Sequence, residues 1–190
     1  MKKTFKLIIL LLAFCISYQS AQAEDKSYTI RAGDVLQVTV WKEDGLDREI
    51  IVLPDGTIDF PLIGSLNVQG QSTSAAQALI AEKLKKFIPD ASVIVVVKAA
   101  LGHTVSVIGQ VAKPGEIVMG HWLTVMQALS QAGGLTPYAS ESNIIILRRE
   151  NDKEISIPFP YDDVIRGRHL DKDLALNPGD VVVVPTASLF

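Results

Sequence analysis

The chain has 190 residues, of which 48% are hydrophobic, and a formal net charge of −3 from 18 basic and 21 acidic side chains. This length suits one or two small domains, and the hydrophobic content is too high for a disordered protein. An acidic balance without a basic run argues against nucleic acid as a partner, and a single cysteine excludes a disulfide framework.

The first 23 residues have the pattern of a secretory signal peptide. Three lysines precede an apolar core at residues 7–16, and Ala21-Gln22-Ala23 then presents small residues to a signal peptidase. We therefore expect cleavage between Ala23 and Glu24. The apolar core is shorter than the about 20 residues that a membrane-spanning helix needs. Cleavage would remove three of the 18 basic residues, leaving 15 against 21 acidic ones and a net charge of −6.

Cys15 leaves a second interpretation of the N-terminus open. A bacterial lipoprotein signal also places a cysteine behind apolar residues, and lipid would then be attached at Cys15. We disfavour this alternative because such signals place a small residue before the cysteine, whereas Phe14 is bulky. Both interpretations take the chain out of the cytoplasm.

Residues 24–100 predict a small β-rich domain with one helix. Alternating, β-branched segments predict strands at 28–30, 35–41, 50–53, 57–60, 62–68 and 91–98. Pro54-Asp55-Gly56 predicts a hairpin turn between two of these strands. Ser74 and Gln77 suggest a capping box for a helix that runs to Phe87 with one apolar face, and Thr73 is the alternative N-cap. The nearly continuous apolar run at 91–98 indicates a strand buried on both faces.

Residues 101–190 predict a second unit that resembles a β-grasp, after a joint at 99–103. Its strands are expected at 104–109, 116–119, 143–148, 154–158 and 181–184. Thr124 and Gln127 suggest a capping box for a short helix, which Gly133-Gly134 would end in a left-handed C-cap. Lys113-Pro114-Gly115 predicts a turn before the second strand. The predicted fold class is α+β.

Two similar Gly-Asp turns stand near opposite ends of the chain. Gly33-Asp34 and Pro178-Gly179-Asp180 both lead into valine-rich strands. Glycine supplies unusual φ values and the aspartate can accept local backbone N–H bonds, so we interpret both carboxylates as turn chemistry and not as catalytic acids. We expect the same need for unusual φ at four glycines, where a change to valine should impair folding or assembly: Gly33, Gly56, Gly115 and Gly134.

The sequence offers no persuasive catalytic or metal site. The histidines show no ligand spacing and are interpreted as structural or surface residues: His103, His121 and His169. The acidic residues near the C-terminus are interpreted as a solvated loop: Asp162, Asp163, Asp171, Asp173 and Asp180. Asp171-Lys172-Asp173 lacks the glycine and the distal glutamate of a calcium loop. We predict no enzyme activity, no cofactor and no metal.

Two tryptophans are the remaining candidates for ligand contact. Trp41 and Trp122 present large aromatic rings that could stack on sugars, and packing in the core or at an interface is the favoured alternative.

The order of the motifs resembles the polysaccharide export protein family, in particular its Wza-type outer-membrane members. The first domain matches through Tyr28, Ile30, Gly33-Asp34, Leu36, Val38, Val52, Pro54-Asp55-Gly56-Thr57-Ile58, Phe60-Pro61-Leu62-Ile63-Gly64 and Gly70. The second resembles the soluble-ligand-binding β-grasp (SLBB) domain through Val107, Gly109, Val111, Lys113-Pro114-Gly115, Ala128-Leu129, Ala132-Gly133-Gly134, Arg148, Leu176, Pro178-Gly179-Asp180-Val181 and Val184-Pro185.

This resemblance implies a non-catalytic, ring-shaped homo-oligomer that encloses a conduit for capsular polysaccharide or exopolysaccharide. The resemblance also implies a periplasmic protein associated with the outer membrane, whose ring would align with an inner-membrane polysaccharide copolymerase. Longer family members continue beyond the equivalent of Val184-Pro185 into further domains and an amphipathic helix, whereas six residues follow Val184 here. We therefore expect an outer-membrane β-barrel partner to complete the path. A monomeric periplasmic glycan-binding or adaptor protein is the alternative, and a glycan-modifying enzyme is the third.

Overall fold

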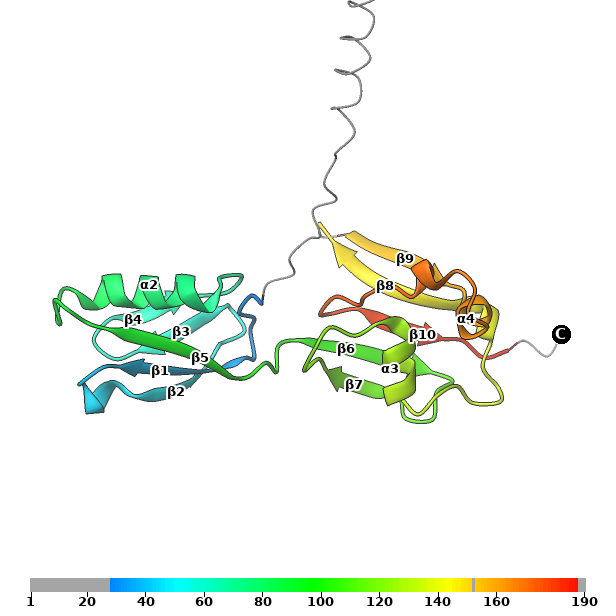
Figure 1. Cartoon of the computed structure of the whole chain (residues 1–190), viewed down its shortest axis with the longest axis horizontal. Coiled ribbons are helices and arrows are strands. Elements are labelled where there is room, and N and C mark those ends of the chain that lie inside the picture. The colour runs from blue at the N-terminus through cyan, green and yellow to red at the C-terminus, as the bar shows by residue number, and fades with distance from the viewer. Residues whose placement is uncertain (1–27, 152, 188–190) are drawn as a thin grey trace, which may run out of the picture.

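The computed structural model describes residues 28–151 and 153–187, which form two lobes with separate hydrophobic cores (Figure 1). Helices and mainly antiparallel sheets make up both lobes, so the predicted α+β class is confirmed. We call residues 28–99 the N-terminal lobe and residues 104–187 the C-terminal lobe. Residues 100–103 connect them.

The N-terminal lobe combines a three-stranded sheet, a hairpin and one long helix. Its elements are β1 (Val35–Val40), η1 (Asp44–Leu46), β2 (Arg48–Ile51), β3 (Thr57–Phe60), β4 (Gly64–Asn67), α2 (Thr73–Leu84) and β5 (Val93–Ala99). β1 is the central strand and runs antiparallel to both β2 and β5, while β3 and β4 form a separate hairpin. Alternate residues of β1 point into the core, where they meet the buried face of α2: Leu36, Val38 and Val40 from β1, with Ala76, Ile80 and Leu84 from α2.

The C-terminal lobe is a five-stranded mixed sheet with its first and last strands parallel in the middle. Its elements are β6 (Thr104–Gly109), β7 (Gly115–Val118), α3 (Val125–Gln131), η2 (Glu141–Asn143), β8 (Ile144–Glu150), β9 (Lys153–Phe159), α4 (Tyr161–Ile165), η3 (Leu170–Lys172) and β10 (Val181–Val184). The strand order is β7-β6-β10-β8-β9, and only the β6–β10 pair is parallel among the described strands. This order, with α3 packed on the sheet, is the expected β-grasp-like arrangement.

The two helix starts were predicted with different success. Thr124 and Gln127 form the complete capping box of α3, as predicted. In α2 the N-cap is Ser72, whose hydroxyl accepts a hydrogen bond from the Ala75 N–H at 3.2 Å, and the prediction of Ser74 was wrong. Residues 72–74 are all serine or threonine and can all serve as N-caps, so the local sequence does not distinguish between them.

The end of α2 and the strand at 28–30 were also predicted wrongly. The helix ends at Leu84, so Phe87 lies outside its apolar face and is exposed. Residues 28–30 are not a strand, because the backbone of Ile30 pairs only with the turn at Gly70 and Gln71.

The turn at Pro54-Asp55-Gly56 forms, but the strands that flank it belong to different sheets. Gly56 N–H donates to the Leu53 carbonyl at 2.8 Å, and the Asp55 carboxylate accepts from the Thr57 N–H at 3.0 Å. β2 pairs with β1 and β3 pairs with β4, so the predicted hairpin between 50–53 and 57–60 was wrong. The strand predicted at 62–68 is shorter, because Leu62 has a left-handed φ of 70° in the turn before β4.

Two further predictions need correction. Gly115 does not occupy the centre of a turn but opens β7, opposite Val107. β5 is buried on one face only, since Ile94 and Val96 are 47% and 50% exposed while Val93 and Val95 lie in the core.

Candidate functional site

The two lobes meet closely at Gly102. A Cβ added to this glycine would lie 2.3 Å from the Ala32 carbonyl oxygen, a distance that real Cβ atoms do not reach. On the opposite side of the contact, Gly33 has a φ of +90° in the turn before β1. The junction is therefore a backbone-to-backbone contact that requires a residue without a side chain at position 102.

Asp34 of the N-terminal lobe stabilises this contact through hydrogen bonds. Its carboxylate is fully buried and accepts hydrogen bonds from the Arg31 N–H at 2.7 Å, from the Gly102 N–H at 2.9 Å and from the Tyr28 hydroxyl at 2.5 Å. The bond from Arg31 is the local turn bond that the sequence suggests. The bond from Gly102 crosses 68 residues of sequence and ties the start of the second lobe to the first.

His103 lies beside Asp34 and completes the junction. Its ring is stacked on that of Tyr28 with 4.8 Å between the centroids, and its Nε2 is 2.9 Å from the Thr29 carbonyl oxygen and 3.7 Å from Asp34 Oδ2. Burial, together with the hydrogen bond to the Asp34 carboxylate, raises the pKa of the Tyr28 hydroxyl above its ordinary value. The prediction of a structural role for His103 agrees with these contacts, although its partners are 69 residues or more away in sequence and were not predicted.

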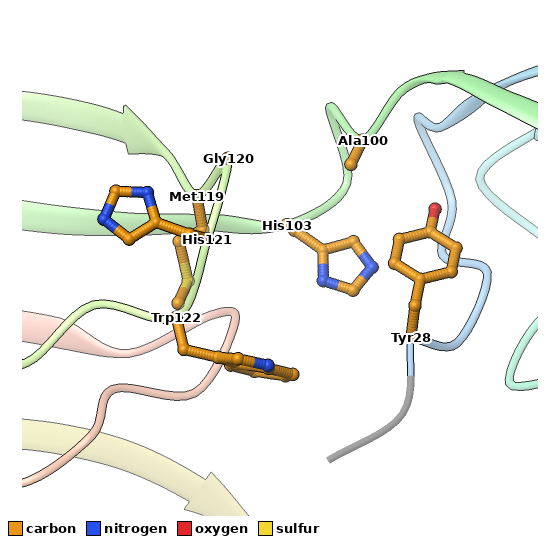
Figure 2. Close-up of a pocket in the computed structure, with 7 residues that line it drawn as sticks. All are labelled: Tyr28, Ala100, His103, Met119, Gly120, His121 and Trp122. Carbon is orange, nitrogen blue, oxygen red and sulfur yellow. The ribbon is translucent and has the colours of Figure 1, made fainter.

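A pocket of about 160 Å³ opens beside this junction (Figure 2). Both lobes contribute to its lining, which consists of Tyr28, Ala100, His103, Met119, Gly120, His121 and Trp122. None of these residues carries a full charge when the two histidines are neutral, and three of the side chains are imidazole or indole rings. In Figure 2 the His103 ring lies between Tyr28 and Trp122, and the His121 ring points away from them.

The second Gly-Asp turn is built like the first. Asp180 is 2% exposed, and its carboxylate accepts from the Asn177 N–H at 2.8 Å, as Asp34 accepts from the residue three positions before it. Here the distant partner is Arg148 on β8, whose Nε and Nη2 lie 3.0 and 2.7 Å from the carboxylate oxygens. The hydrogen bond to Asp180 raises the pKa of the Arg148 guanidinium. Asp180 therefore does not belong to a solvated acidic loop, and that interpretation was wrong for this residue.

The other predicted acidic residues do not assemble into a site. Asp173 caps the start of α3 by accepting from the Met126 N–H at 3.0 Å, and Asp163 pairs with Arg168 on the surface. Within the part of the chain that the structure describes, no group of three or more His, Cys, Asp or Glu side chains could hold a metal ion. Ala23, Glu24 and Cys15 lie outside the described residues.

An exposed sheet surface is the second notable feature of the N-terminal lobe. The side of the β2-β1-β5 sheet that faces away from the core carries Val35, Gln37, Thr39, Glu49, Ile51, Ile94 and Val96, which the strand register places on one side. We call this set the outer face. Ile51 is 60% exposed, and Trp41, which follows β1, is 65% exposed. Core packing is thereby excluded for Trp41 within the described chain, and Trp122, at 43% exposed, is not a core residue either.

No helix among the described residues combines the length and the apolar character that crossing a bilayer requires.

Two family models together match most of the chain. The model for polysaccharide biosynthesis/export proteins matches residues 22–98, and the SLBB domain model matches residues 103–184. The boundary between the two matches falls at the junction that Asp34 and His103 hold together. The chain therefore belongs to the polysaccharide export protein family, as a polysaccharide export domain followed by an SLBB domain.

Curated relatives carry names from the same field. The chain is 28% identical over 158 residues to the polysialic acid transport protein KpsD of Escherichia coli, covering 83% of this chain and 28% of that protein. It is 25% identical to the EPS I polysaccharide export outer membrane protein EpsA of Ralstonia nicotianae, covering 85% of this chain and 48% of the relative. It is 30% identical to the exopolysaccharide production protein ExoF of Rhizobium meliloti, covering 71% of this chain and 34% of that protein. The chain thus spans less than half the length of these relatives.

Proposed function

We propose that this protein is a non-catalytic component of a machine that exports capsular polysaccharide or exopolysaccharide, and that it forms a ring around the path of the polymer. It would act in the periplasm at the outer membrane, in line with an inner-membrane copolymerase and with an outer-membrane partner. The observation that carries the proposal is the succession of an export domain and an SLBB domain over residues 22–98 and 103–184.

The junction supports a mechanical role over a catalytic one. The buried side-chain nitrogen and oxygen atoms of the described residues all have hydrogen-bond partners. The Asp34 carboxylate accepts hydrogen bonds from the backbone of both Arg31 and Gly102, and these bonds hold the two lobes together. A rigid two-lobe block is a suitable subunit for a ring, because each ring contact then sets the position of both lobes. An acidic surface would also limit adhesion of anionic glycans in transit.

The outer face supports self-association through the N-terminal lobe. The sequence of β5 has the apolar character of a strand covered on both sides, yet the single chain covers only one. We assign the missing cover to a neighbouring copy, which would meet Ile94 and Val96 on β5 and Ile51 on β2, with Gln37 and Thr39 on the central strand between them. Surfaces that combine apolar and polar side chains in this way are typical of protein interfaces.

Val96→Lys should convert the assembly to smaller species. A lysine at this half-exposed position places a charge in the proposed contact, and we expect the dissociation constant between subunits to rise at least about tenfold. Size-exclusion chromatography with light scattering on the protein purified from the periplasm measures the mass. Phe87→Lys is the matched control, because Phe87 is an equally exposed apolar residue beyond α2 and outside the outer face.

The same measurement separates the two leading functions. A wild-type mass that is a multiple of the chain mass, reduced by Val96→Lys alone, supports the ring. A wild-type monomer at micromolar concentrations would favour the alternative function, a periplasmic glycan-binding or adaptor protein of the same pathway.

A further inference from the structure

The orientation of His103 determines which of its ring atoms can meet a ligand. The side chain is 7% exposed, and its Nε2 lies 2.9 Å from the Thr29 carbonyl oxygen. A carbonyl oxygen only accepts hydrogen bonds, so Nε2 carries the proton and, in the neutral ring, Nδ1 is left with a lone pair. The stacking on Tyr28 and the bond to Thr29 hold the ring in this orientation.

The lone pair of Nδ1 faces the pocket. Figure 2 shows the two ring nitrogens of His103 on different sides, one toward Tyr28 and the other toward the side on which Trp122 lies. Within residues 28–151 and 153–187, every buried side-chain nitrogen or oxygen atom has a hydrogen-bond partner. Nδ1 of His103 has no such partner there, so Nδ1 is not a buried atom. Nδ1 is therefore accessible from the pocket that His103 lines. A buried and fixed imidazole thus presents one hydrogen-bond acceptor to whatever enters.

The remaining walls define the chemistry of that ligand. Trp122 is 43% exposed and offers an indole ring, and Met119 and Ala100 add apolar surface. Among the residues that the structure describes, the lining contains no lysine, arginine or carboxylate, so an ionic group would lose its hydration without gaining a counter-charge from them. A volume of about 160 Å³ is below that of pockets for drug-sized molecules and suits a single small ring.

We propose that this pocket binds one uncharged pyranose unit of the exported glycan, with a sugar hydroxyl donating to His103 Nδ1 and the C–H face of the sugar packed on Trp122. A pyranose combines apolar C–H faces with hydroxyl donors at its rim, which matches an aromatic wall beside one fixed acceptor. The assignment rests on the proposed function for its ligand class. One such contact per subunit is weak, so a polymer could move from subunit to subunit without being trapped.

The binding test uses the tryptophan in the pocket as its probe. The chain contains two tryptophans, so Trp41→Phe leaves Trp122 as the only one. This protein is titrated with neutral hexasaccharides of glucose, galactose and mannose and with hexagalacturonate, and the emission of Trp122 is recorded. We expect a saturable change with at least one neutral series at about millimolar concentration and a weaker response to the uronate.

Variants of two histidines, one in the lining and one outside it, separate a specific site from a general surface effect. His103→Phe keeps a ring against Tyr28 and removes Nδ1, and the loss of one neutral hydrogen bond should weaken sugar binding about fivefold. His169→Asn is the control, because His169 is exposed, lies outside the lining and has a left-handed φ that asparagine tolerates, so this change should leave binding unchanged. If His103→Phe does not fold, Trp122→Ala serves instead, with amide chemical shifts in NMR spectra as the readout.

The outcomes are decisive in both directions. Absence of binding by all three neutral series, binding of the uronate alone, or unchanged binding by His103→Phe or Trp122→Ala would each overturn the assignment. Failure of the export proposal looks different: the purified protein would still bind neutral sugars, while cells lacking it would still display their polymer. A protein that supports export but binds no sugar would remove the pocket assignment alone.

Discussion

Gly109→Ala is expected to destabilise the C-terminal lobe by at least about 3 kcal/mol. Gly109 ends β6 with a φ of +92°, where an L-residue is strained, and a Cβ there would lie 2.0 Å from the carbonyl oxygen of Val184. The obstacle is backbone and not a flexible side chain, so the parallel pairing of β6 with β10 would have to separate. Urea denaturation followed by the emission of Trp122, in a Trp41→Phe background, reports on this lobe.

Gly120→Ala is the matched control for Gly109→Ala. It lies in the same lobe, its added Cβ meets nothing within 4 Å and its φ is not left-handed, so a change within about 0.5 kcal/mol is expected. Equal stability of the two variants would show that β6 and β10 do not approach each other as described.

Asp34→Ala is expected to lower the free energy of unfolding of the N-terminal lobe by about 3–5 kcal/mol. The change leaves the N–H groups of Arg31 and Gly102 without their acceptor in a buried place, and each unsatisfied donor costs about 1–3 kcal/mol. The Tyr28 hydroxyl loses its partner as well. Because the bond to Gly102 links the lobes, the variant should also loosen the junction.

The two tryptophans allow the effect of Asp34→Ala to be assigned to a lobe. Trp41 lies in the N-terminal lobe and Trp122 in the C-terminal lobe, so single-tryptophan versions report on each separately. We expect the denaturation midpoint seen by Trp41 to fall more than that seen by Trp122. Asp171→Ala, a change of an exposed aspartate, is the control and should stay within about 0.5 kcal/mol. Unchanged denaturation midpoints for Asp34→Ala would contradict the proposed role of the Asp34 carboxylate in stabilising the junction.

The sequence predicted features that depend on neighbouring residues. The capping box of Thr124 and Gln127 involves residues three positions apart, and its hydrogen bonds need nothing beyond the first turn of the helix. The β-grasp-like character of the second lobe was likewise predicted, and the predicted strands of this lobe lie close to the observed bounds.

Features that depend on distant residues were missed. The partners of Asp34 and Asp180 include groups 68 and 32 residues away, which no local pattern reveals. The sequence did not predict that positions 102 and 109 exclude any side chain, because the obstacles are carbonyl oxygens of other segments of the chain. The repeated Gly-Asp pair was the available signal, since a buried carboxylate after a turn requires more acceptor bonds than the turn supplies.

The apolar run of β5 illustrates a different limit. Its composition predicts a strand that is covered on both faces, whereas in the single chain only one face is covered. Ile94 and Val96 are apolar and exposed in the single chain, and this difference between composition and exposure is what directs attention to the outer face.

The location of the polymer in cells that lack this gene tests the export role most directly. We expect cells without the protein to lose surface polysaccharide and to accumulate it in the periplasm, with display restored by the wild-type gene but only weakly by the Val96→Lys form. Undiminished polymer on the surface of the deletion strain would contradict the account.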